Sequence, residues 1–99
     1  MAIPSLRELL QDKESNVRIN AATALVSMGA EEKAVVPILI EALRSQDRDV
    51  RRRAAAALGN IGADAKEAVP ALREALQGYR DSQVRASAAA ALEKIVPGS

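Results

Sequence analysis

The sequence predicts an all-α fold, an α-α superhelix (solenoid) of three stacked helix pairs with six helices. Its first sign is a repeat, since Pro4, Pro37 and Pro70 open similar phrases and lie 33 residues apart. A Val-Arg pair follows each proline after thirteen or fourteen residues, and no alternating strand pattern occurs. A period of this size marks units that cannot bury their apolar faces alone and must stack.

The first helix of each pair is predicted from the apolar stripe around the proline. In the middle repeat this stripe has the i, i+3, i+4, i+7 spacing of a helix with one buried face: Val36, Leu39, Ile40 and Leu43. Pro37 is expected in the first turn or just beyond a kink, because its ring removes a backbone donor and restricts the preceding residue.

The second helix carries its own stripe, formed in the middle repeat by Val50, Ala54, Ala57, Leu58 and Ile61. Asp49 is expected to cap its start, because a carboxylate accepts hydrogen bonds from the first amides of a helix. The outer repeats carry Asn16 and Gln83 at that place. Gly29 and Gly62 are expected to end their helices as left-handed residues.

Six helices are therefore expected, at 4–13, 16–28, 34–45, 49–61, 67–78 and 82–96. The 99 residues are expected to form one domain (1–99), with repeats at about 4–36, 37–69 and 70–96 and a tail at 97–99. The third repeat differs at two places. Gly78-Tyr79 inserts one residue in its turn, and Val96 stands where Gly62 does.

Three features of the middle repeat recur in varied form from residue 4 to residue 96. They are Pro37, Asp-Val-Arg at 49–51, and Ala-Ala-Ala-Ala-Leu-Gly-Asn-Ile-Gly at 54–62, which leads through Gly-Ala-Asp-Ala-Lys-Glu-Ala-Val to Pro70. This pattern resembles the short HEAT-like repeat of the phycobilisome-lyase type. The resemblance implies a right-handed superhelix whose second helices line the concave side. It implies no single activity, because such proteins include scaffolds, bilin-attachment subunits and DNA-repair relatives.

The composition argues against an enzyme. The chain has no His and no Cys, so it lacks an imidazole base, a thiolate nucleophile and the usual zinc ligands. No catalytic residue, cofactor or metal is expected. The absence of Cys and of any signal or membrane-spanning segment fits a cytoplasmic protein with no membrane partner.

Charge and aromatic content argue against nucleic acid as a partner. The net charge is only +1, from 14 basic and 13 acidic residues, and Tyr79 is the one aromatic residue. Asp47 and Asp49 interrupt the arginine cluster between 44 and 53. The arginines of the repeated Val-Arg pairs are expected to form a structural ladder to carboxylates or helix carbonyls of neighbouring repeats, with ligand contact as the alternative: Arg18, Arg51 and Arg85.

A partner surface is predicted by placing the second helices on a helical wheel. Nine residues lie opposite the buried stripe: Ile19, Thr23, Val26, Arg52, Ala56, Gly59, Ala86, Ala90 and Glu93. Seven of them are the candidate partner-binding residues: Ile19, Thr23, Val26, Arg52, Ala56, Ala86 and Ala90. Their small, aliphatic character fits a groove for a helix or an extended peptide. Crowding between helices, or packing against a preceding repeat, is the alternative explanation.

These observations favour a non-enzymatic protein-binding or scaffolding module that binds a protein or peptide on its concave surface. The alternative is a structural building block, a natural fragment or a designed repeat protein with no partner of its own. A bilin-lyase-like subunit and a DNA-binding module are less favoured. Self-association as a dimer is also expected, by end-to-end stacking or by swapping helices across the 29–37 or 62–70 connection. The reason is that the two ends of the stack offer apolar residues: Ile3, Leu6, Leu9, Leu10, Ala89, Ile95 and Val96.

Overall fold

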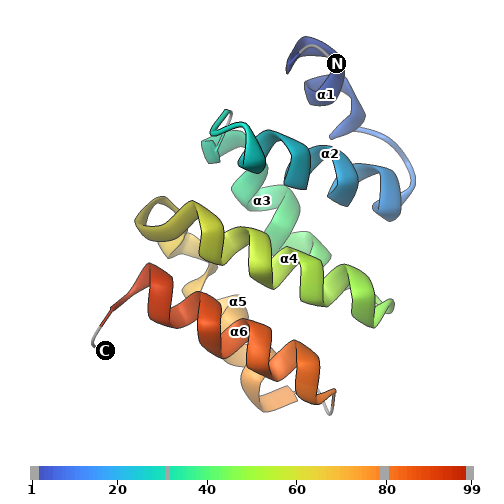
Figure 1. Cartoon of the computed structure of the whole chain (residues 1–99). Helices are drawn as coiled ribbons and strands as arrows, with labels where there is room; N and C mark the ends of the chain where they lie inside the picture. The colour runs from blue at the N-terminus through green and yellow to red at the C-terminus, as the bar shows by residue number, and fades with distance from the viewer. Residues whose placement is uncertain (1–2, 31, 79–80, 98–99) are drawn as a thin grey trace.

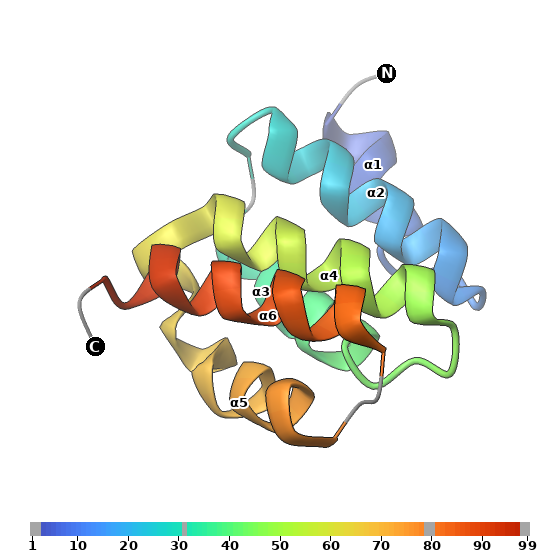
Figure 2. The same cartoon turned by 60° about the horizontal axis from the view of Figure 1, so that its bottom comes forward.

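The computed structural model describes residues 3–30, 32–78 and 81–97 and confirms the all-α repeat fold. The elements are α1 (Ile3–Leu9), α2 (Ser15–Ser27), α3 (Glu32–Ala42), α4 (Arg48–Ile61), the 3-10 helix η1 (Gly62–Ala68), α5 (Val69–Gly78) and α6 (Ser82–Ile95). They form two layers, with α2, α4 and α6 side by side in one and α1, α3 and α5 in the other (Figures 1 and 2). We call the first of these the B layer.

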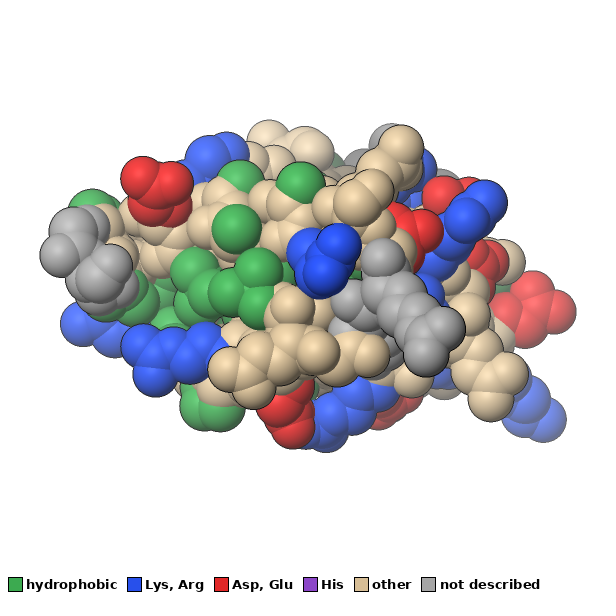
Figure 3. Space-filling view, turned by 90° about the horizontal axis from the view of Figure 1, so that it is seen from below, with side chains coloured by type: hydrophobic (Ala, Val, Ile, Leu, Met, Phe, Trp, Pro, Cys, Tyr) green, Lys and Arg blue, Asp and Glu red, His purple; other side chains and the backbone are tan. Residues whose placement is uncertain are grey.

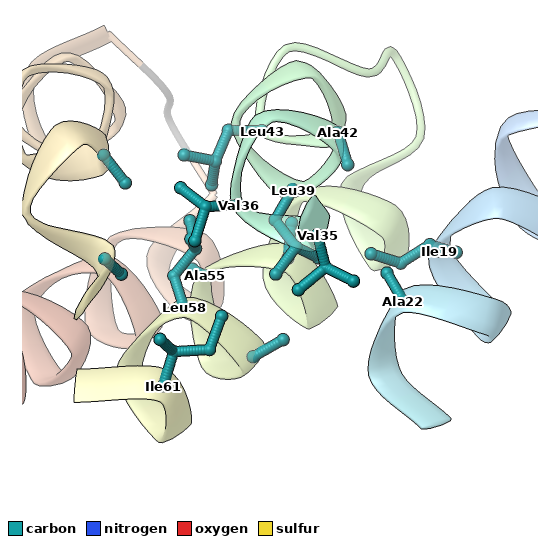
Figure 4. Close-up of a cluster of buried hydrophobic side chains, with 14 of the residues drawn as sticks. Ile19, Ala22, Val35, Val36, Leu39, Ala42, Leu43, Ala55, Leu58 and Ile61 are labelled. Atoms are coloured by element: carbon teal, nitrogen blue, oxygen red, sulfur yellow. The ribbon is translucent and has the colours of Figure 1, made fainter. Parts of the chain in front are cut away.

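The core between the layers is aliphatic. Its largest fully buried side chains come from α2, α3, α4, α5 and α6 and from Leu43, which follows α3: Ile19, Leu25, Leu39, Leu43, Leu58, Leu72, Ile95, Val35, Val36, Val50 and Val84. Figure 4 shows α3 at the centre of this cluster, with side chains reaching toward it from α2 and α4. Among the described residues no polar or charged side chain is buried, so burial of apolar surface is the main force that holds the stack together.

The contact between α4 and α6 is the most extensive one between elements of the described chain. It depends on Gly59, because a Cβ atom added there would lie only 3.0 Å from the Cα atom of Ala91. Val26 occupies the same repeat position in α2, and its side chain packs partly buried against the core. The contact between α2 and α4 is correspondingly smaller.

In the first two repeats, the turn between the two helices is closed by the arginine of the Val-Arg pair. The Arg18 guanidinium donates to the carbonyl oxygens of Asp12 (2.7 Å) and Lys13 (3.0 Å), and that of Arg51 donates to the carbonyl of Ser45 (2.7 Å). The expectation that such carbonyls belong to neighbouring repeats is therefore wrong for these three bonds, each of which stays within one repeat. Arg18 does reach a carboxylate of the next repeat, at 3.3 Å from Glu41.

These turns also explain why the first helices end early. We expected helices to residues 13 and 45, whereas α1 ends at Leu9 and α3 at Ala42. Tight i to i−3 hydrogen bonds follow both ends, including those from the Asp12 amide to Leu9 and from the Ser45 amide to Ala42, each 3.1 Å long. The inserted Tyr79 lies outside the described residues.

The helix cap was predicted at the wrong aspartate. Helix α4 begins at Arg48, and the cap is Asp47, whose carboxylate accepts from the amide of Asp49 at 2.8 Å. Asp49 lies in the first turn, where its carboxylate accepts from Arg52 instead (3.2 Å). Helix α6 uses the equivalent device, because Asp81 accepts from the amides of Gln83 (2.9 Å) and Val84 (3.1 Å).

The positive φ expected at two glycines is confirmed, whereas the position expected for Pro37 in the first turn is wrong. Gly29 (φ 66°) and Gly62 (φ 78°) do adopt positive φ, although the ψ of −139° places Gly62 outside the left-handed helical region. Pro37 lies inside α3 instead of in its first turn, since that helix begins at Glu32. In the third repeat the equivalent stretch divides into η1 and α5, with non-helical backbone at Ala65.

Gly59→Ala should destabilise the protein, because the new methyl group meets the backbone of α6. Overpacking costs about 1–3 kcal/mol, while exchanging glycine for alanine in a helix returns about 1 kcal/mol. A net loss of about 1 kcal/mol in the free energy of unfolding should therefore appear in urea titrations. Gly78→Ala is the control, since an added Cβ there has nothing within 4 Å. Equal stability of the two variants would contradict the close contact.

The Asp81 cap should make stability depend on pH. Amide hydrogen bonds, the Val84 bond foremost, and the charges of Arg48 and Arg51 lower the pKa of the Asp81 carboxyl, although partial desolvation opposes them. A lowered folded-state pKa means that this stabilisation is present above the unfolded pKa of about 3.9 and is lost as pH falls through the folded value.

Asp81→Asn keeps a capping oxygen but removes the titrating group. The stability difference between wild type and Asp81→Asn should therefore shrink as pH falls from about 5 to below the folded pKa. Thermal unfolding followed by circular dichroism measures it. A difference that stays constant over this pH range would show that the Asp81 cap contributes no pH dependence.

Candidate protein-binding face

The outward surface of the B layer carries rows of residues that occupy the same position in each repeat. One row is Thr23, Ala56 and Ala90, of which the two alanines are exposed and Thr23 is partly buried. The Thr23 hydroxyl donates to the carbonyl of Asn20 at 3.0 Å. Ala86 and Glu93 are also exposed on α6, whereas Arg52 and Val26 are partly buried. Most of the predicted ridge therefore does lie at the surface.

Ile19 is the exception among the candidate partner-binding residues. Its side chain is 0 % exposed and lies against α3, where it lines a small cavity of about 70 Å³ with Ile38 and Ala42 (Figure 4). The helical wheel considered only the helix within the same repeat, whereas α3 of the following repeat covers a second side of α2. Gly59 is buried for a similar reason, beneath α6. Neither residue is available to a partner.

A groove lies between α2 and α4 on the B-layer face, with a volume of about 190 Å³. Seven residues line this α2–α4 groove: Thr23, Val26, Ser27, Arg53, Ala56, Ala57 and Asn60. Helical-wheel reasoning missed Ser27, Arg53 and Asn60 and assigned Ala57 to the buried stripe alone. The repeat period could have identified such residues, because residues 33 apart occupy equivalent positions on neighbouring helices of the B layer. Thr23 and Ala56 are one such pair, and Ser27 and Asn60 are another.

Two consecutive arginines of α4 extend to opposite neighbours. Arg52 donates to Gln83 Oε1 on α6 (2.9 Å) and to Asp49, whereas Arg53 donates to Asn20 Oδ1 on α2 (2.5 Å). Arg53 therefore bonds a neutral amide, and among the described residues no carboxylate forms an ion pair with it. The groove thus combines an apolar floor with a cation whose charge is not balanced locally.

Other arginines of the basic cluster bridge adjacent repeats. Arg44 lies 3.6 Å from a carboxylate oxygen of Glu74, and Arg48 lies 3.5 Å from one of Asp81. Both arginines are largely exposed, so each ion pair contributes little to stability. They join arginines of the second repeat to carboxylates of the third, so the positive charges of Arg44 and Arg48 are balanced where these two repeats meet.

The described residues hold no group of three or more His, Cys, Asp or Glu side chains that could bind a metal ion. Within the same part of the chain, no helix is both long and apolar enough to cross a membrane.

The stacked helix pairs define the class of α-solenoid repeat proteins, and comparison with protein families specifies which one. The family described as HEAT repeats matches residues 36–98, a HEAT repeat matches residues 2–30, and the PBS lyase HEAT-like repeat matches residues 17–45. The chain belongs to the HEAT-repeat family. Comparison with curated proteins gives no match. HEAT repeats generally mediate protein–protein interaction or scaffolding and are typically non-enzymatic.

Proposed function

We propose that this chain is a non-enzymatic protein-binding or scaffolding module that binds its partner on the B-layer face. The α2–α4 groove is the observation that carries the proposal. It is open, it is floored by Val26, Ala56 and Ala57, and its edge carries the Arg53 charge that no described carboxylate balances. A protein partner fits this surface, because HEAT repeats typically bind proteins.

The chemistry of the groove indicates a peptide segment with an aliphatic residue close to an acidic one. The aliphatic side chain would lie on the apolar floor, where burial stabilises it. The carboxylate would reach the Arg53 guanidinium, whose N–H groups donate strong hydrogen bonds to a carboxylate. Ser27 and Asn60 add a hydroxyl and an amide for the backbone of the bound segment.

Self-association of the chain is part of this proposal, and the sequence led us to expect a dimer. The ends of the stack are less apolar than that expectation assumed. Leu6, Leu10 and Ile95 are buried within the chain, and Met28, at 49 % exposure, is the one large exposed hydrophobic residue among those described. A building block with no partner of its own remains the alternative, and a cytoplasmic location remains an expectation.

Ala56→Glu should abolish partner binding, because it places a carboxylate in the α2–α4 groove one helical turn from Arg53. Ala34→Glu is the matched control, since Ala34 is an exposed alanine of α3 in the other layer. Each purified variant is immobilised, and the proteins retained from a cell extract are quantified by mass spectrometry. Circular dichroism verifies that both variants keep their helix content.

The proposal expects proteins that are retained by wild type and by Ala34→Glu but not by Ala56→Glu. Equal retention by all three would move the binding surface away from the groove. If wild type retains no protein, the chain behaves as a building block without a partner.

A further inference from the structure

The end of the stack formed by α5 and α6 leaves open the positions that a following repeat covers elsewhere in the chain. Leu43 is 1 % exposed and Leu58 0 %, whereas their equivalents in the third repeat, Leu76 and Leu92, are partly exposed. Figure 3 shows hydrophobic side chains gathered on this end. We call it the C-flank and define it by the residues Val69, Leu76, Ala89, Leu92 and Val96.

The opposite end of the stack is open in the complementary way. Ala57 and Ile61 are buried in the second repeat, whereas their equivalents in α2, Ala24 and Met28, are partly and clearly exposed. Leu9, which holds the position of the buried Ala42, is also partly exposed. We call this end the N-flank and define it by the residues Leu9, Ala24 and Met28.

The contacts between successive repeats show how the two flanks would meet. In each, the earlier repeat presents the face that is the C-flank in the third repeat, and the later repeat presents the face that is the N-flank in the first. Gly59 of the second repeat faces Ala91 of the third, and Leu43 lines a shared pocket with Ala71 and Ala75. We infer that a second copy of this chain stacks head to tail, with the C-flank of one molecule on the N-flank of the next. This inference rests on the self-association included in the proposed function. It extends the expected dimer to an open series, because a head-to-tail contact leaves one flank free at each end.

The two flanks carry opposite charges at the repeat positions that form ion pairs between successive repeats within the chain. Within the chain, Arg18 and Arg44 each pair with a glutamate of the following repeat, Glu41 and Glu74 respectively. Glu8 holds this glutamate position at the N-flank, and Arg85 holds the Arg18 position in the third repeat. Both are exposed, and neither forms an ion pair with another described residue. In a head-to-tail stack, Arg85 faces Glu8 of the second copy as Arg18 faces Glu41.

Glu93 stands at the position of Gly59, so the contact between copies cannot be as close as that between α4 and α6. The α2–α4 contact shows the spacing that a side chain permits here, because Val26 is accommodated there opposite Ala57 and Asn60. The corresponding residues of a second copy are Ala24 and Ser27. The Ser27 hydroxyl is a donor suited to the Glu93 carboxylate.

The test blocks one flank at a time with variants at exposed positions. Ala89→Glu places a charge on the C-flank, Met28→Glu places one on the N-flank, and Ala34→Glu is the control outside both. Light scattering with sedimentation velocity measures mass from micromolar to millimolar concentration. Circular dichroism verifies the fold, and Ala89→Lys replaces Ala89→Glu if the latter loses helix content.

Head-to-tail stacking predicts dimers and larger species for wild type and for Ala34→Glu, and association at least about tenfold weaker for each flank variant alone. An equimolar mixture of Ala89→Glu and Met28→Glu should then form a 1:1 dimer that grows no further, since each partner keeps one native flank. A flank variant that alone dimerises as strongly as wild type would overturn stacking in favour of a symmetric pair. A monomeric wild type would overturn self-association altogether, while the groove proposal would remain testable by Ala56→Glu.

Discussion

The close approach of α4 and α6 is the constraint on which the rest of this structure depends. It exists because position 59 carries no side chain, so the Cα atom of Ala91 in α6 lies only 3.0 Å from where a Cβ atom would be. This approach fixes the register of α6, which in turn brings Asp81 to Arg48 and Gln83 to Arg52. The polar bonds across the B layer are therefore consequences of aliphatic packing between small residues. They orient the side chains at the surface and contribute little to stability.

The candidate binding surface arises where the repeat departs from this regular packing. Val26 stands at the position of Gly59 and limits the contact between α2 and α4. The space that remains is the α2–α4 groove, into whose edge Arg53 extends to meet Asn20. The residue at this one repeat position, Gly59 or Val26, thus separates the tight α4–α6 junction from the open α2–α4 junction, although both junctions have an aliphatic core.

The repeat period predicted the architecture well, because burial of the leucines at two repeat positions follows from a helical stripe alone: Leu6, Leu39 and Leu72 at one, Leu25 and Leu58 at the other. It failed where a residue is governed by the following repeat. Ile19 is covered by α3, a neighbour that a wheel drawn for a single pair does not include. Asp47 caps α4 instead of Asp49 because the turn that Arg51 closes ends at Asp47. Composition and spacing do not show where that turn ends. Asn20 and Arg53 lie 33 residues apart, so the repeat period places them at equivalent positions of α2 and α4. Their hydrogen bond could not be predicted, because it depends on the relative tilt of the two helices.

Native-state amide hydrogen exchange tests most directly whether the α4–α6 contact dominates the stack. The account predicts that the slowest amides lie in α4 and α6 and exchange together, at the free energy of global unfolding. Amides of α2, held by a smaller contact and by the seven-residue α1, should exchange at least about tenfold faster, equivalent to about 1.4 kcal/mol in opening free energy. Amides of α2 that exchange as slowly as those of α4, or amides of α6 that exchange faster than those of α2, would contradict it.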